Sequence, residues 1–144
     1  GNATDHKYIL DYIREFSKNY DMRQLAFDRH LSGYIASELH ESKIEVVEFG
    51  QGFVSMSHPT KEFERKILNG EIIHDGNACL RWQMQCVIIT QTPAGDIKII
   101  KNKNKQHQKV DGIVAAVMAL GQYLDYRGSE PKGGKSFTVL GLDF

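Results

Sequence analysis

Helical and strand patterns alternate along the first fifty residues, and this alternation restricts the fold more than any other feature of the sequence. Apolar side chains recur at helical spacing, stop, and give way to short runs that are apolar or rich in β-branched residues. Thr4 or Asp5 is available as the first N-cap. The predicted elements are a helix at about 5–20, a strand at 24–27, a helix over 31–39 and a strand at 43–49. This order predicts an α/β fold.

The second half of the chain predicts three more helices and a hairpin. Val110, Ile113 and Val117 belong to the most regular apolar periodicity in the sequence. One predicted helix runs from Ser57 to Asn69-Gly70 and has Pro59 in its first turn. A short helix opened by Gly76-Asn77 follows, and the last predicted helix is at 109–126. Between these two helices, strands at 87–91 and 97–101 form a projecting hairpin around the loop 92–96.

Length and composition indicate one globular domain. The 144 residues suffice for a sizeable core without disulfides or structural metal, and 18 basic and 18 acidic residues give no net charge. Cys79 and Cys86 would lie about 10 Å apart along one helix, too far for a disulfide, so we expect two buried free thiols and a reducing cytoplasm. No apolar run approaches the length of a membrane span, and no signal peptide is recognisable.

Two carboxylates stand where a metal site could form. Asp28 follows an apolar strand, and ligands of open α/β sheets bind at the carboxyl ends of strands. Asp111 opens the last helix and is the only acid between Asp96 and Asp125. Carboxylates from different elements can hold divalent ions, and two ions about 3.5–4 Å apart can clamp a phosphodiester. Alternatively, Asp111 is an acid favoured by the helix dipole and Asp28 a cap at the end of a strand.

A basic stretch lies between Asp96 and Val110 and contains no acid. Its lysines could contact phosphates without sequence preference, or they could keep a solvated loop soluble. Arg81 and Trp82 offer a guanidinium and a ring to a nucleic acid, although a single Trp in a helix is also typical of a core. The lysines are Lys98, Lys101, Lys103, Lys105 and Lys109.

Several other kinds of site are not predicted. The six histidines are scattered without a CxxC or HxxxH pair, which argues against zinc. His74 and Asp75 could orient a metal ligand, or could belong to a turn that Gly76 and Asn77 favour. No Walker A, GxGxxG or GxSxG motif occurs, so we expect no nucleotide or ATPase site in this chain.

Six sequence blocks, taken in order and spacing, carry a resemblance to a known family. They are Leu25–Arg29, Val47–Gly52, Ser55–Ser57, His74–Asn77, Leu80–Trp82, and Val110–Ala115 with Met118–Leu120. The set resembles the C-terminal nuclease domain of the large terminase subunit of tailed bacteriophages and prophages. The resemblance covers about residues 5–126.

The resemblance implies a ribonuclease H-like fold, a mixed sheet flanked by helices with acidic residues around two Mg²⁺ or Mn²⁺ ions. It implies an endonuclease that cuts concatemeric double-stranded viral DNA during packaging. Asp28 matches the family's second carboxylate and Asp111 its last. Arg29 and Arg81 match motif positions, where they could meet the DNA backbone or form a structural ion pair. These metals would activate a water and stabilise the leaving oxygen.

The same resemblance implies partners and a place of action. These are a packaging ATPase domain in the same full-length chain, the small terminase subunit and the portal, in the cytoplasm of a bacterial host and away from membranes. We expect a partial nuclease domain over residues 1–127 and a Gly- and Lys-rich tail over 128–144, with an edge strand at 137–142.

One departure from the family concerns its first metal ligand, an Asp on an opening strand that precedes the first helix. This chain starts at that helix, so we expect it to be truncated and weakened in metal affinity and cleavage. Asp143, after a strand-like run, could replace the absent ligand, although termini are usually loosely held.

Two other functions stay open on the sequence. One is a non-catalytic DNA-binding or assembly module that uses the basic stretch and the hairpin. The other keeps the ribonuclease H-like scaffold but resolves DNA junctions or transposes DNA, because that scaffold hosts many activities.

Overall fold

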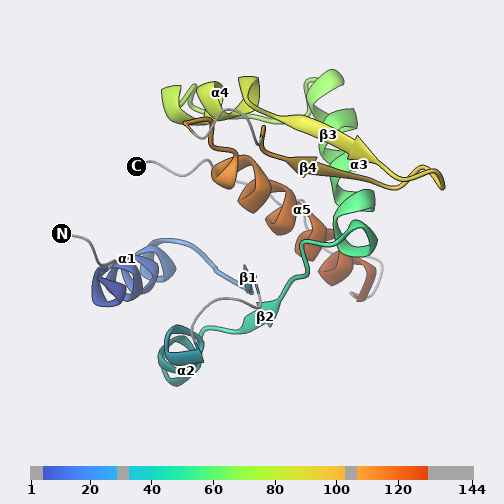
Figure 1. Ribbon diagram of the computed structural model, residues 1–144. Helices are drawn as coiled ribbons and strands as arrows, with labels where there is room; N and C mark the ends of the chain where they lie inside the picture. The colour runs from blue at the N-terminus through green and yellow to red at the C-terminus, as the bar shows by residue number, and fades with distance from the viewer. Residues whose placement is uncertain (1–4, 29–32, 103–106, 130–144) are drawn as a thin grey trace. The chain divides into compact units, whose positions relative to one another are not determined.

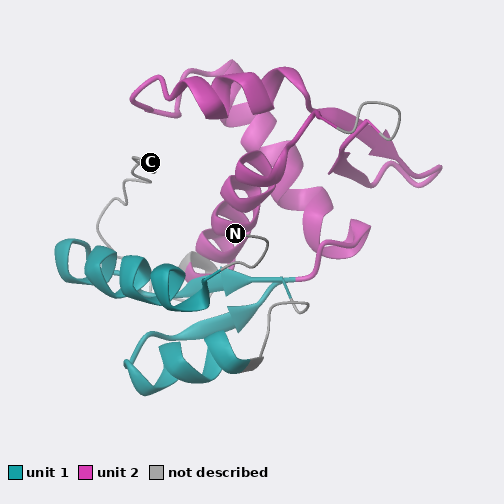
Figure 2. Ribbon diagram, turned by 60° about the vertical axis from the view of Figure 1, so that its left-hand side comes forward, with its two compact units in different colours: residues 1–49 teal, residues 50–144 magenta. Residues whose placement is uncertain are grey.

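The computed structural model describes residues 5–28, 33–102 and 107–129, and within them the chain forms five helices and four strands (Figure 1). They fall into two compact units, residues 1–49 and 50–144 (Figure 2). The elements are α1 (His6–Asn19), β1 (Leu25–Phe27), α2 (Gly33–Glu41), β2 (Val46–Glu48), α3 (Phe53–Leu68), α4 (Ala78–Gln85), β3 (Ile88–Gln91), β4 (Ile97–Ile100) and α5 (Asp111–Ser129). The predicted domain boundary after residue 127 stays a prediction, and the predicted strand at 137–142 lies outside the described residues.

The first unit is a parallel strand pair with two helices, as the alternating pattern predicts. β1 and β2 run parallel with Ala26 opposite Val47, and the Phe49 N–H donates to the Phe27 carbonyl at 2.8 Å. Parallel strands need a crossover connection, and α2 lies in that connection. Asp5 caps α1, because its carboxylate accepts a hydrogen bond from the Lys7 N–H at 2.9 Å.

Both helices of this unit contribute to one apolar core. Leu10 of α1 and Leu39 of α2 are almost completely buried, and Ile35 and Ile44 complete the cluster. Ile13, Met22, Leu25 and Val46 pack around it. Such burial is the main source of stability for helices of this length.

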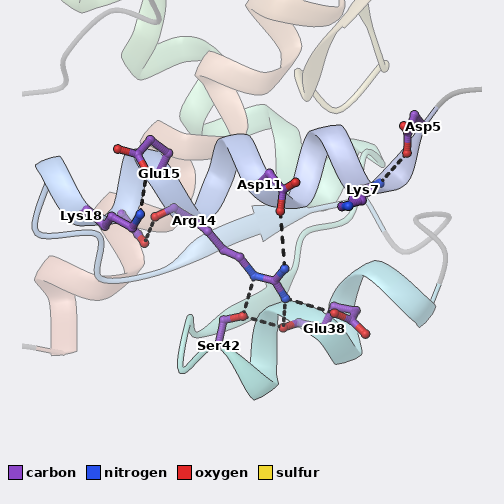
Figure 3. Close-up of polar contacts among 9 residues, drawn as sticks. Asp5, Lys7, Asp11, Arg14, Glu15, Lys18, Glu38 and Ser42 are labelled. Atoms are coloured by element: carbon purple, nitrogen blue, oxygen red, sulfur yellow. Dashed lines mark hydrogen bonds and ion pairs between the residues drawn. The ribbon is translucent and has the colours of Figure 1, made fainter.

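Arg14 adds a polar tie between the two helices (Figure 3). Its Nε donates to the Ser42 hydroxyl at 2.9 Å, and its Nη2 reaches the Glu38 carboxylate at 3.0 Å. Ser42 in turn donates to the Glu38 carbonyl at 2.9 Å. The planar guanidinium therefore engages the C-terminal turn of α2 at several points.

The chain leaves α2 through a residue in the left-handed region. Lys43 has φ of 61°, and its N–H donates to the His40 carbonyl at 2.9 Å. The Ile44 N–H donates to the Leu39 carbonyl at 3.1 Å. This pair of bonds resembles the glycine-containing helix endings in which carbonyls of the last turn are satisfied, but here the residue is lysine.

In the second unit, α3, α5 and the β3–β4 hairpin pack together (Figure 2). Met56 of α3 and Val117 and Leu120 of α5 are buried, and the alternating residues Ile97 and Ile99 of β4 are buried as well. β3 and β4 are antiparallel, with Thr90 opposite Lys98, which confirms the predicted hairpin. The predicted last helix is also confirmed, and it extends three residues beyond 126, to Ser129.

The predicted start of α3 is wrong. The helix begins at Phe53 after the N-cap Gly52, so Pro59 lies inside it and not in its first turn. Proline inside a helix removes one backbone hydrogen bond, a cost that burial can offset. Pro59 and Ser57 are both buried, and the Ser57 hydroxyl serves another element, as described below. The predicted end at Asn69-Gly70 is confirmed, with Gly70 at φ of 67°.

The two thiols are free, as predicted, but only one of them is buried. Cys86 caps the C-terminus of α4 at 4% exposure, whereas Cys79, in the first turn of α4, is exposed. The expectation of two buried thiols is wrong for Cys79, because the first turn of α4 buries no side chain. No helix in the described part of the chain is long and apolar enough to span a membrane.

Candidate functional site

Asp28 lies directly after β1, as the sequence predicts. It is half-buried and follows Phe27, whose carbonyl receives the N–H of Phe49. Because β1 and β2 are parallel, their carboxyl ends share one edge of the pair, and the exposed Glu48 ends β2 there. Glu48 is a further carboxylate at this edge that is not among the predicted site residues, although its place near the end of a predicted strand is a signal that could identify it. Arg29 lies outside the described residues.

Asp111 is the first residue of α5, also as predicted. Its side chain is exposed, whereas the preceding Val110 is 6% exposed. The Val114 N–H donates to the Val110 carbonyl at 2.9 Å, which begins the hydrogen bonds of the helix. An anionic group at this end is favoured by the helix dipole. Asp111 is therefore both stabilised by its helix and open to a ligand.

The predicted meeting of the two carboxylates stays a prediction. Asp28 belongs to the first compact unit and Asp111 to the second. Within the described residues, no group of three or more His, Cys, Asp or Glu side chains is placed to hold a metal ion. The oxygen donors of Asp28 and Asp111 nevertheless fit Mg²⁺ or Mn²⁺ chemically, because these ions prefer hard oxygen ligands.

Residues 74–77 form a turn that opens α4. The Gly76 N–H donates to His74 Nδ1 at 3.0 Å, and the Asn77 N–H donates to the Asp75 carboxylate at 2.9 Å. Gly76 adopts φ of 83°, which favours glycine, and Asn77 caps α4 through the N–H groups of residues 79 and 80. The turn interpretation is confirmed, and any influence of His74 or Asp75 on a metal ligand stays a prediction.

Arg81 fastens this turn to α4. Its Nη2 donates to the Gly76 carbonyl at 2.9 Å, and the residue is exposed overall. One side of the guanidinium is thus engaged, which leaves other donors of the group for an external acceptor. The neighbouring Trp82 is 40% exposed, so the interpretation as a core residue is wrong for this ring.

The predicted basic stretch divides in the structure. The Lys98 Nζ lies 4.9 Å from the centre of the Phe53 ring, and the residue is half-buried on β4. Lys101 and Lys109 are exposed on either side of the undescribed residues 103–106, which include Lys103 and Lys105. Lys101 and Lys109 are therefore the described lysines of this stretch best placed to meet an external anion.

Several ion pairs of the second unit lie at the C-terminal end of α3. Arg65 contacts the Glu62 and Glu71 carboxylates at 2.7 and 2.6 Å, and Lys66 contacts Glu71 at 3.0 Å. Hydrogen bonds from Arg65, Asn69 and Lys66 hold the pKa of Glu71 at about 2, and Arg65 also lowers the pKa of Glu62. These residues form a charged network at the C-terminal end of α3. No functional residue is predicted there from the sequence.

Comparison with known proteins identifies the class of this α/β chain. Residues 1–126 match the family described as "Terminase large subunit, endonuclease domain", and the chain belongs to that family. Its fold is the ribonuclease H-like α/β fold of the large-terminase nuclease domain, so the predicted resemblance and fold class are both confirmed.

Particular relatives extend this result. The chain is 29% identical over 126 residues to Protein YmfN of Escherichia coli strain K12, and 28% identical over 123 residues to the terminase large subunit of Enterobacteria phage HK97. The crystal structure of the HK97 large terminase superposes with a TM-score of 0.74 at 27% identity, covering 85% of this chain. The chain spans 28% of Protein YmfN, 24% of the HK97 sequence and 26% of the chain in the HK97 crystal structure.

Proposed function

We propose that this chain is a metal-dependent endonuclease domain that cuts concatemeric double-stranded DNA during genome packaging. The observation that carries the proposal is Asp111, an exposed carboxylate at the N-terminus of α5 in a domain of the terminase endonuclease family. Asp28, after β1, supplies the second carboxylate.

In this proposal each residue has a separate task. Asp28 and Asp111 would hold Mg²⁺ or Mn²⁺ through their carboxylate oxygens, and such ions would supply water activation and stabilisation of the leaving oxygen. Arg81, Lys101 and Lys109 contact the phosphate backbone, which gives affinity without sequence preference. The 74–77 turn supports Arg81 through the Gly76 carbonyl.

The proposal extends to the larger assembly that the family implies. The nuclease domain works beside a packaging ATPase domain in one full-length chain, with the small terminase subunit and the portal as partners. Its place of action is the cytoplasm of a bacterial host. Support for these statements comes from membership of the family. This chain spans about a quarter of the length of its matched relatives.

A supercoiled-plasmid nicking assay with Mn²⁺ tests the proposal. It compares the wild-type chain with Asp111→Ala and Asp125→Ala, the latter an exposed carboxylate on the same helix. The same variants are also made in a longer chain that includes the strand expected from the family resemblance to precede α1. We expect nicking by the longer chain to be lost in Asp111→Ala and kept in Asp125→Ala. Equal nicking by the Asp111 and Asp125 variants would remove Asp111 from the mechanism.

A non-catalytic DNA-binding module is the second candidate, and the exposure of Lys101 and Lys109 favours it. DNA affinity that falls steeply with salt, yet does not respond to chelator or to Asp28→Asn, together with no nicking, would support this candidate against the first.

A further inference from the structure

The N-terminus of α5 is capped from another helix. The first N–H groups of a helix have no partner within it and are usually satisfied by the side chain of the preceding residue. Here that residue is Val110, an apolar and buried side chain that cannot accept a hydrogen bond. The Gly112 N–H donates instead to the side-chain carbonyl of Gln83, on α4, at 2.6 Å. Figure 1 shows α4 beside the end of α5 where this bond forms.

Gln83 is held in the orientation that this bond needs. Its Nε2 donates to the Cys79 sulfur, one turn earlier in α4, at 3.5 Å. The two ends of the amide differ, since one donates and the other accepts, so these contacts together fix which end faces Gly112. The side chain is half-buried, which limits competition from water.

Gly112 gives Gln83 the space for this approach. A Cβ atom at residue 112 would lie 2.8 Å from Leu80 Cδ2 and 2.9 Å from Gln83 Oε1, closer than real Cβ contacts. A side chain at residue 112 would therefore displace the ends of the Leu80 and Gln83 side chains, and no left-handed backbone is involved. Leu80, Gln83 and Gly112 form one contact between α4 and the first turn of α5.

We infer that Gln83 is a positioning residue for Asp111, an inference that rests on the proposed function. The Gly112 N–H and the Asp111 carbonyl belong to the same planar peptide group. A hydrogen bond that holds this N–H therefore also restricts the backbone from which the Asp111 side chain projects. Removing a residue that orients a metal ligand typically lowers the affinity of the site for its metal ion by about 10- to 100-fold.

Mn²⁺ binding to the whole chain tests the inference, measured by paramagnetic broadening of backbone amides and by titration. Gln83→Met keeps the length of the side chain but has only a weak acceptor, whereas Gln83→Glu keeps a strong acceptor. Gln85→Met is the matched control, an exposed glutamine on the same helix. Asp111→Asn tests the proposed ligand itself. Urea unfolding of every variant checks that it folds.

We expect Gln83→Met to weaken Mn²⁺ binding at least about tenfold and to speed hydrogen exchange at Gly112. Gln85→Met should match the wild type, and Gln83→Glu should recover most of the affinity. If Asp111→Asn loses Mn²⁺ while a folded Gln83→Met binds it like the wild type, the positioning role is overturned and the proposed function stands. If Asp111→Asn binds Mn²⁺ like the wild type, the proposed function fails, and the positioning role with it.

Discussion

The N–H of Ile97 donates a hydrogen bond to the hydroxyl of Ser57 at 3.2 Å, and both residues are buried. This contact joins the first residue of β4 to the interior face of α3, 40 residues earlier in the chain. It gives a role inside the helix to Ser57, the residue at which the sequence predicts the helix to start. The hydroxyl satisfies a buried backbone donor that water does not reach.

Ser57→Ala should destabilise the second unit by about 1–3 kcal/mol, the cost of leaving a buried donor unpaired. Urea unfolding followed by circular dichroism measures the change. Ser55→Ala, on the same helix and half-buried, is the control and should change stability by less than about 1 kcal/mol. A loss below about 0.5 kcal/mol for Ser57→Ala would show that the hydrogen bond adds little beyond the packing of the side chain.

Thr60→Val should increase the stability of the protein, whereas Ser57→Ala should decrease it. The Thr60 hydroxyl is buried, and it has no hydrogen-bond partner among the described residues. Valine has nearly the same shape without the polar group, so the change should stabilise the protein by about 1 kcal/mol. Thermal unfolding measures the effect. A lower unfolding temperature in Thr60→Val would indicate that the hydroxyl is satisfied in solution.

The stability of the C-terminal end of α3 should depend on pH because of Glu71. Arg65 and its neighbours hold the pKa of Glu71 at about 2, below the ordinary value of 4.5. A lowered pKa means that the network stabilises the folded state above about pH 4.5 and loses this effect as the pH falls toward about 2. Carboxyl NMR titration should show this pKa. Because the network is exposed, its effect should shrink in high salt.

Removing the guanidinium tests the cause of that shift. Arg65→Met should raise the pKa of Glu71 toward 4.5, because the Arg65 hydrogen bond is its largest cause. Lys61→Met, which removes another exposed cation of α3, should leave the pKa near 2. The assignment is contradicted if both variants titrate alike.

Lys43→Gly should stabilise the first unit by about 1 kcal/mol, since φ of 61° strains a residue with a Cβ atom. The greater freedom of glycine in the unfolded chain subtracts part of this gain. Lys43→Ala is the control, because alanine meets the same strain as lysine. Unfolding midpoints that agree for Gly and Ala would mean that the turn carries no strain in solution.

The number of lysine–phosphate contacts can be obtained from the dependence of DNA affinity on salt concentration. Each lysine that binds a phosphate contributes about 0.9 to the slope of log affinity against log salt. Replacing both Lys101 and Lys109 with Ala should therefore reduce the slope by about 1.8 if both bind duplex DNA. Lys18→Ala, an exposed lysine of α1 paired with Glu15, is the control. An unchanged slope in the double variant would remove these lysines from the interface.

Local patterns were sufficient to predict most elements of the fold. The periodicity around Val117 predicts α5, and the turn residues 92–96 predict the hairpin, because both signals are short in range. The start of α3 was mispredicted because Ser57 and Pro59 carry the signature of a helix start. Only the burial of both residues, and the hydrogen bond from β4 to Ser57, show that they lie inside the helix.

The candidate site was predictable in part. Asp28 and Asp111 were found because each stands at the boundary of an element. Gln83 was not, because its partner is a backbone amide 29 residues away and a single glutamine in a helix gives no signal. The expected chemistry comes from the family resemblance and stays a prediction, and the structure adds the Gln83 contact with Gly112.

Because one thiol is exposed and the other is buried, the two cysteines can serve as a natural probe of local unfolding near α4. A maleimide dye should label Cys79 in the native protein, whereas Cys86 should react only when its surroundings open. Once Cys79 is blocked, the rate of labelling at Cys86 measures how often the end of α4 detaches from the core. Any variant described above can be ranked on that scale without an introduced probe.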